Sequence, residues 1–134
     1  MNRRDFILAG AAVSLALPLM AQAAVEYAPD LLKAELAAGK TVFLDFKASW
    51  CTTCAAQERV ITALLAENAE YEKRISFINV DWDQWGDGEL VKQLNIPRRS
   101  TLVVLKGDAE LGRIVAGTGK AEIKALLDVA LQAV

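Results

Sequence analysis

The chain has 134 residues, with 15 lysines and arginines against 17 aspartates and glutamates, and a formal net charge of −2. This balance, without a long run of basic residues, argues against nucleic acid or an anionic membrane surface as a partner. The chain has two cysteines and no histidine, which excludes a zinc site with four Cys or His ligands from one chain.

The N-terminal segment has the features of an export signal. Arg3 and Arg4 precede an uncharged apolar run over residues 8–20, and residues 21–23 are Ala-Gln-Ala, small residues of the kind that a signal peptidase reads. The apolar run is shorter than the roughly 20 residues that a transmembrane helix needs. The arginine pair followed by Asp-Phe-Ile resembles a twin-arginine export signal. An ordinary secretory signal and an uncleaved anchor are the alternatives.

We therefore expect residues 1–23 to be a cleaved signal peptide and residues 24–134 to form a domain in the periplasm, exported by the twin-arginine route. The signal carries two arginines and one aspartate, so its removal changes the formal charge from −2 to −3. A chain of this length suits one compact domain with its own core.

Helix and strand patterns alternate along this domain. Asp30 is the expected N-cap of the first helix, and Gly39 the residue that ends it. The expected elements, in chain order, are a helix over 30–38, a strand over 40–46, a helix over 54–66 that extends towards 73, a strand over 75–80, a short helix over 89–94, strands over 101–105 and 111–115, and a helix over 120–133.

Residues 81–88 are polar, contain two glycines and predict a loop. Trp82 and Trp85 lie in this loop. They either pack over an edge of the sheet or form an exposed contact surface.

Strands separated by helices imply parallel pairing with right-handed crossovers, whereas the turn signal at residues 106–110 adds an antiparallel hairpin. The expected fold class is α/β, with a mixed central sheet covered by helices on both faces.

The two cysteines, Cys51 and Cys54, lie where a strand pattern gives way to a helix pattern. Cys51 falls at or just before the helix N-terminus, where unpaired N–H groups and the helix dipole favour a thiolate. Cys54 lies one turn further on, on the same face and within disulfide reach. This arrangement predicts a redox-active dithiol. A structural disulfide would stabilise little, because it closes across only two residues, and a metal shared between two subunits is the other alternative.

Residues 45–54, Asp-Phe-Lys-Ala-Ser-Trp-Cys-Thr-Thr-Cys, resemble the active-site segment of the thioredoxin family. The resemblance continues through residues 77–81 and 101–107 to the final helix, and so covers essentially the whole domain. It implies a thioredoxin-like fold.

The resemblance also implies roles for three residues. Cys51 is the expected nucleophile, Cys54 the resolving thiol, and Asp45 a buried acid that relays a proton to or from Cys54. On an apolar strand Asp45 should be desolvated, which favours its protonated form; the alternative is an aspartate at the strand end that points to solvent. No cofactor is implied beyond the Cys51–Cys54 disulfide.

The sequence departs from the family pattern at three positions. Phe77 stands where the family has a lysine near the buried acid, and Lys47 where it has a second tryptophan. The positive charge near Asp45 has therefore either moved or been lost. Ser100 stands where the family has a cis-proline, and a cis peptide before a non-proline residue costs about 3 kcal/mol, so we expect a trans peptide there.

Four residues are expected to bind substrate: Trp50, Arg99, Ser100 and Thr101. Trp50 would shield the disulfide. Residues 98–100, Arg-Arg-Ser, would frame the groove and add positive charge that stabilises the thiolate or selects an acidic partner; a solvated turn is the alternative.

These features predict an exported thiol–disulfide oxidoreductase that reduces protein disulfides. The Thr52-Thr53 pair makes the segment most similar to reductive periplasmic domains that receive electrons from a membrane thiol carrier. The expected partners are protein disulfide or dithiol substrates and such a carrier, and the expected state is a monomer. The alternatives are a redox-sensing module without turnover, acting through the Trp82 and Trp85 loop, and a subunit-bridging metal or iron–sulfur dimer.

Overall fold

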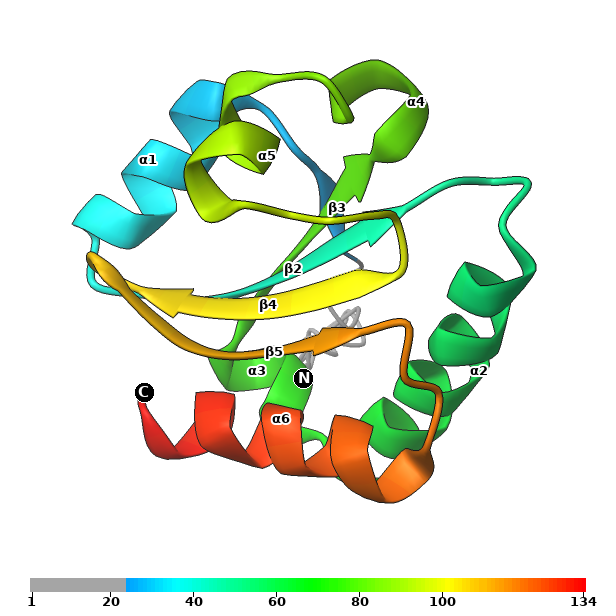
Figure 1. The fold of residues 1–134 in the computed structure, drawn as a ribbon. Coiled ribbons are helices and arrows are strands. Elements are labelled where there is room, and N and C mark those ends of the chain that lie inside the picture. Colours follow the sequence, from blue (N-terminus) through cyan, green and yellow to red (C-terminus); the bar gives the residue numbers. More distant parts are fainter. Residues whose placement is uncertain (1–23) are drawn as a thin grey trace, which may run out of the picture.

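The computed structural model describes residues 24–134, and the expected signal peptide over 1–23 lies outside them. Figure 1 shows a central sheet between two layers of helices. The elements in chain order are β1 (Val25–Glu26), α1 (Pro29–Ala37), β2 (Thr41–Lys47), α2 (Thr52–Glu67), α3 (Glu70–Arg74), β3 (Ser76–Asp81), α4 (Trp82–Trp85), α5 (Glu89–Leu94), β4 (Thr101–Lys106), β5 (Ala109–Val115) and α6 (Lys120–Gln132). Within the described part of the chain, no helix is both long and apolar enough to cross a membrane.

The sheet has five strands in the order β1-β3-β2-β4-β5. The central strand β2 pairs parallel with β3 and antiparallel with β4, and β4 forms an antiparallel hairpin with β5. The predicted mixed α/β sheet is therefore confirmed. The expected extended lead-in contributes a short edge strand, β1, parallel to β3.

Alternation along β2 divides the core into two parts. Val42, Leu44 and Phe46 belong to the cluster under α1 and α5, whereas Phe43 packs in the second cluster, which α2, α3 and α6 cover. Asp45 shares the side of the strand on which Phe43 lies, because side chains two residues apart face the same way. The strand thus carries a carboxylic acid into the buried layer beside α2.

Several helix boundaries differ from the expectation, and α2 begins at Thr52 rather than at residue 54. The first helix begins at Pro29, with Ala28 rather than Asp30 as its N-cap, because the fixed φ of proline suits the first helical position. The expected continuous helix from residue 54 towards 73 breaks at Asn68, which is extended and whose Oδ1 accepts a hydrogen bond from the Glu70 N–H at 3.0 Å. That bond starts α3 as a separate helix.

The predicted loop over residues 81–88 contains the short helix α4. Asp81 caps it by accepting a hydrogen bond from the Asp83 N–H at 3.0 Å. Trp82 and Trp85 are partly buried against the core, and the Trp85 ring meets the Tyr27 ring edge-on with 5.0 Å between centroids. Of the two interpretations of these indoles, packing over the sheet is therefore the one observed.

Candidate active site

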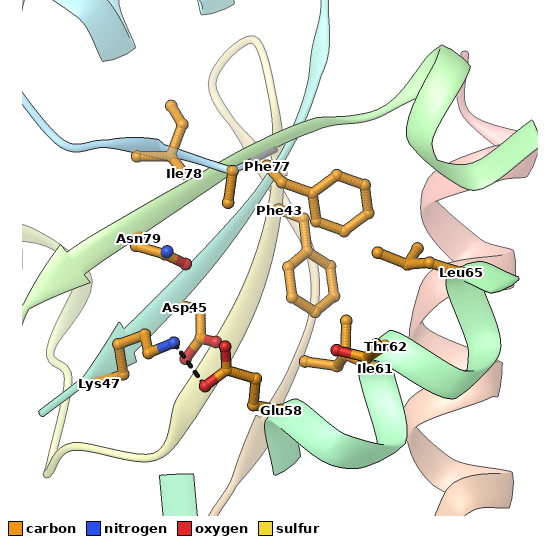
Figure 2. Close-up of a pocket in the computed structure, with 11 residues that line it drawn as sticks. Phe43, Asp45, Lys47, Glu58, Ile61, Thr62, Leu65, Phe77, Ile78 and Asn79 are labelled. Carbon is orange, nitrogen blue, oxygen red and sulfur yellow. Dashed lines mark hydrogen bonds and ion pairs between the residues drawn. The ribbon is translucent and has the colours of Figure 1, made fainter. Parts of the chain in front are cut away.

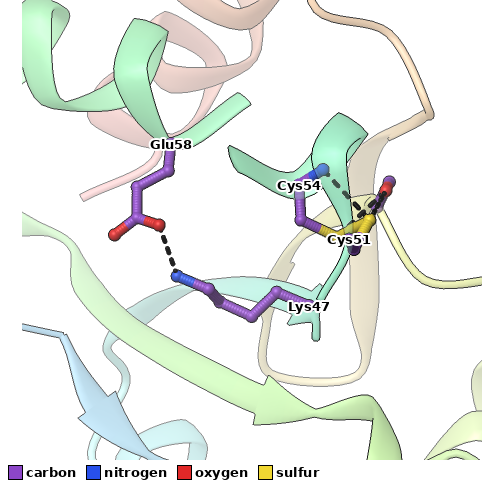
Figure 3. A network of polar contacts seen from close by, with 5 residues as sticks. Lys47, Cys51, Cys54 and Glu58 are labelled. Carbon is purple, nitrogen blue, oxygen red and sulfur yellow. Dashed lines mark hydrogen bonds and ion pairs between the residues drawn. A yellow bond between two sulfur atoms is a disulfide. The ribbon is translucent and has the colours of Figure 1, made fainter. Parts of the chain in front are cut away.

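The dithiol lies directly after the central strand. Cys51 is the N-cap of α2, and its Sγ accepts a hydrogen bond from the Cys54 N–H at 3.1 Å. Cys51 and Cys54 form a disulfide with 5.2 Å between their Cα atoms (Figure 3). Both side chains are buried. The helix start supplies a backbone donor to the Cys51 sulfur, an arrangement that stabilises a thiolate when the bond is reduced.

Ser100 lies against both sulfurs. Its hydroxyl oxygen is 3.1 Å from Cys51 Sγ and 3.0 Å from Cys54 Sγ, and the residue has no exposed surface. No cis peptide bond occurs within residues 24–134, so the peptide before Ser100 is trans, as expected from its cost. The backbone of Ser100 is left-handed, with φ at 65°.

Gln57 is a site residue that the sequence analysis did not identify. It is fully buried, and its Nε2 donates hydrogen bonds to the carbonyl oxygens of Ser100 and Gly117, both at 2.9 Å. The sequence did contain a signal for it. Positions 54, 57 and 61 share the inward face of α2, where helical spacing predicts apolar side chains, and Gln57 is a polar residue on that face. Buried polar side chains of this kind are normally there to make hydrogen bonds.

Asp45 is buried as the strand pattern predicted (Figure 2). Desolvation raises the pKa of its carboxyl group from 3.8 to about 7, with Lys47 lowering this pKa and Glu58 raising it. One carboxyl oxygen of Asp45, Oδ1, has no hydrogen-bond partner. The group borders a cavity of about 180 Å³. A carboxyl group in such surroundings can take up and release a proton near neutral pH.

The cation near Asp45 comes from Lys47. Lys47 Nζ forms an ion pair with Glu58 Oε2 at 3.0 Å (Figure 3), and both residues line the same cavity as Asp45 (Figure 2). Phe77 lines the cavity too, with its ring centroid 5.2 Å from that of Phe43. Of the two possibilities left open by the sequence, the positive charge has moved rather than been lost.

Replacing Lys47 and replacing Glu58 are expected to move the Asp45 pKa in opposite directions. Lys47→Met should raise it, because a nearby cation that favours the carboxylate is removed, and Glu58→Gln should lower it, because a nearby anion is removed. The measurement is an NMR titration of the Asp45 carboxyl carbon. Glu89→Gln, an exposed substitution on α5, is the control, and shifts of the same sign in both variants would contradict the assignment.

Trp50 and Arg99 lie together beside the dithiol, with Trp50 exposed and Arg99 half-buried. Trp50 is 56% exposed, and its Nε1 donates to the Asp83 carboxylate at 2.9 Å. The Arg99 guanidinium lies 4.6 Å from the centroid of the Trp50 ring, a cation–π contact. Thr101, in contrast, is fully buried and its Oγ1 donates to the Arg98 carbonyl at 2.7 Å. Of the four expected substrate-binding residues, Trp50 is therefore exposed, Arg99 is half-buried, and Ser100 and Thr101 are buried.

Within the described residues, no group of three or more His, Cys, Asp or Glu side chains is arranged to hold a metal ion. Cys51 and Cys54, joined as a disulfide, are a redox-capable pair that the fold brings together.

Comparison with known proteins agrees with this geometry. A family model described as Thioredoxin matches residues 20–129. A thioredoxin H-type from Brassica campestris is 32% identical over 96 residues, 72% of each chain. Among solved structures, Trxlp from Edwardsiella tarda has a TM-score of 0.67 at 26% identity and covers 78% of this chain and 98% of its own. A mutant thioredoxin from Entamoeba histolytica has a TM-score of 0.61 at 28% identity, covering 81% and 100%.

Proposed function

This chain belongs to the thioredoxin family and is a thiol–disulfide oxidoreductase, and from that premise we propose that it is an exported, periplasmic enzyme that reduces protein disulfides. The observation that carries the proposal is the Cys51–Cys54 pair at the start of α2, with the Cys51 sulfur accepting the Cys54 N–H. A low-pKa, reactive cysteine is typical of such an N-terminal position.

The proposed reaction has two exchange steps. The Cys51 thiolate attacks one sulfur of the substrate disulfide; that S–S bond breaks, a mixed disulfide forms, and one substrate sulfur leaves as thiolate. Cys54, after losing its proton, then attacks Cys51. The second substrate sulfur leaves, and the Cys51–Cys54 bond forms. The substrate gains two electrons and the dithiol loses two. The Cys54 proton leaves before the second attack, and the two substrate thiolates take up their protons from solvent.

In this proposal Asp45 takes the proton of Cys54 in the resolving step and returns it when the disulfide is reduced again. Its pKa of about 7 suits both directions of transfer. Trp50 and Arg99 form the substrate-facing surface, and the Arg99 charge favours substrates that carry acidic residues near their disulfide.

The reducing direction and the location are supported by sequence. The Thr52-Thr53 pair is similar to that of reductive exported domains, and the N-terminal arginine pair to a twin-arginine signal. The proposed electron donor is a membrane thiol carrier that passes two electrons to the Cys51–Cys54 disulfide by the same exchange chemistry. The enzyme acts as a monomer in this proposal and needs no other cofactor.

The reduction potential tests the direction. Equilibration of the protein with a thiol buffer, read by tryptophan fluorescence, is expected to give a value near the reducing end of the family, about −270 mV. A value near about −120 mV would instead indicate an oxidant. Catalysed reduction of insulin by the protein with dithiothreitol as donor should accompany the low value. Absence of that turnover would refute the proposed enzyme function.

Export is tested separately. The full chain, expressed in a bacterium with a periplasm, is expected in the periplasmic fraction with its N-terminus near Ala24. Replacement of both Arg3 and Arg4 by lysine should leave the unprocessed chain in the cytoplasm, because a twin-arginine signal is read by a receptor that requires the pair. Normal processing of the double variant would instead indicate an ordinary secretory signal.

A further inference from the structure

The Ser100 hydroxyl contacts both sulfurs of the dithiol, although it is neither the nucleophile nor the proton acceptor of the proposed reaction. Its hydroxyl oxygen lies at nearly equal distances from the two sulfurs, 3.1 Å from Cys51 Sγ and 3.0 Å from Cys54 Sγ. The residue is entirely buried. Substrate therefore cannot reach this hydroxyl from the surface while the loop between α5 and β4 is in place. The atoms that the hydroxyl contacts are the two reacting sulfurs themselves.

The chain holds Ser100 in this place from three sides. Its N–H donates to the Phe46 carbonyl at 2.7 Å, and its carbonyl accepts from the Ala116 N–H at 2.8 Å and from Gln57 Nε2 at 2.9 Å. These bonds fix a left-handed backbone, φ 65°, that a non-glycine residue rarely adopts. A strained backbone of this kind persists where surrounding bonds over-determine it, and such positions concentrate at functional sites.

A hydroxyl in this position has one proton for two sulfurs. A disulfide sulfur is a weak acceptor, whereas a thiolate is charged and accepts strongly. The hydroxyl therefore donates its hydrogen bond to whichever sulfur carries the charge. We propose that Ser100 is a catalytic residue whose hydroxyl donates a hydrogen bond in turn to the Cys51 thiolate and to the departing Cys54 thiolate. This role rests on the proposed exchange reaction.

The two sulfurs do not depend on Ser100 equally. Cys51 Sγ already accepts the Cys54 N–H at 3.1 Å. For Cys54 Sγ, the Ser100 hydroxyl is the one hydrogen-bond partner found within residues 24–134. The effect should therefore be largest when Cys54 becomes an anion, as happens when a donor thiolate attacks Cys51 and breaks the Cys51–Cys54 bond. In that step the donor sulfur bonds to Cys51, and the electron pair of the broken bond leaves on Cys54.

The test compares Ser100→Ala and Ser100→Gly with Thr41→Val. The first two remove the hydroxyl, and glycine also removes the strain of the left-handed backbone. Thr41 carries a buried hydroxyl without a partner at the other end of β2, so Thr41→Val is the matched loss of a buried hydroxyl away from the sulfurs. Far-ultraviolet circular dichroism checks that each variant is folded, and if Ser100→Ala does not fold, Ser100→Gly carries the comparison.

The first readout is the rate at which dithiothreitol reduces the oxidised protein, followed by tryptophan fluorescence. Both Ser100 variants are expected to be reduced about tenfold more slowly than wild type, the effect of removing one hydrogen bond to a charged group, whereas Thr41→Val keeps the wild-type rate. An unchanged rate in Ser100→Ala would overturn the proposal. A slower rate in Ser100→Gly with an unchanged rate in folded Ser100→Ala would do the same, because it would place the effect in the backbone. Where Ser100→Ala does not fold, an unchanged rate in Ser100→Gly overturns the proposal.

The second readout is the equilibrium with glutathione. Losing a donor that stabilises the reduced, thiolate form should shift the equilibrium constant about tenfold towards the disulfide. For this two-electron couple, that shift makes the reduction potential about 30 mV more negative. Neither readout needs a protein substrate. If wild type fails to reduce insulin, the proposed function fails while the Ser100 comparison still stands; if wild type reduces insulin and the variants match it in both readouts, the Ser100 role fails alone.

Discussion

Cys51→Ser is expected to reduce the rate of insulin reduction to that of dithiothreitol alone, and Cys54→Ser to accumulate a mixed disulfide between Cys51 and the substrate. Without Cys51 the site loses the sulfur that accepts a backbone N–H at the start of α2, and Cys54, in the first turn of the helix, is left as the resolving thiol alone. Without Cys54 the first exchange proceeds, but no resolving thiol releases the substrate. Turbidity of reduced insulin measures turnover, and mass spectrometry without reductant measures the trapped species.

Ser49→Ala is a suitable control for both cysteine variants, because Ser49 is an exposed hydroxyl two residues before Cys51 and should leave turnover unchanged. Turnover at the wild-type rate in Cys54→Ser would contradict the two-step reaction. A trapped species in Cys51→Ser but not in Cys54→Ser would reverse the roles of the two cysteines.

The sequence alone located the dithiol correctly because the relevant signals are local. A β-branched apolar run followed within a few residues by helical spacing places Cys51 at a helix start wherever the rest of the chain goes. The same holds for the burial of Asp45, since strand alternation puts it in the layer that contains Phe43. The mixed pairing of the sheet likewise follows from the alternation of helices and strands and the closing hairpin.

The polar contacts of the site could not be predicted in this way, because they join distant parts of the chain. The Ser100 hydroxyl meets sulfurs that lie 46 and 49 positions earlier, and Gln57 reaches a carbonyl 60 positions later. Sequence placed Ser100 in the right loop by resemblance, but a resemblance that expects a proline there says nothing of a hydroxyl. The ion pair between Lys47 and Glu58 was missed for the same reason, since only the packing of α2 on β2 brings the two side chains together.

Helix boundaries failed for a different reason. Asp30 is a good N-cap by residue type, but Pro29 already starts α1. At Asn68 a single side-chain bond to the Glu70 N–H competes with continuing the helix. In each case the alternative helix boundaries differ by little free energy, so helix propensity alone does not decide between them.

Asp45→Asn is expected to remove most of the pH dependence of stability between about pH 4 and pH 7. Burial raises the Asp45 pKa from 3.8 to about 7 because desolvation penalises the carboxylate. Between these values the folded protein holds a proton that the unfolded chain has lost, so the free energy of unfolding falls as pH rises. The loss is complete above about pH 7 and amounts to about 4 kcal/mol, at about 1.4 kcal/mol for each pKa unit.

Urea unfolding of the oxidised protein at a series of pH values measures this effect. Wild type should lose stability from about pH 4 to pH 7, whereas Asp45→Asn should stay nearly level and be the more stable protein above pH 7. Asp87→Asn, an exposed substitution after α4, should keep the wild-type profile. A wild-type profile that rises over this range would contradict the raised pKa.

The same variant separates burial from catalysis. If Asp45 takes the proton of Cys54, Asp45→Asn should slow the resolving step at pH 7 by roughly a hundredfold, a typical contribution of one general base. The difference in rate between wild type and Asp45→Asn should narrow at higher pH, where solvent removes the Cys54 proton directly. Rapid mixing of the reduced protein with a small aromatic disulfide follows mixed-disulfide decay. A level stability profile with unchanged decay would show that Asp45 is a buried acid without a part in exchange, and the proton of Cys54 would then have to leave through solvent.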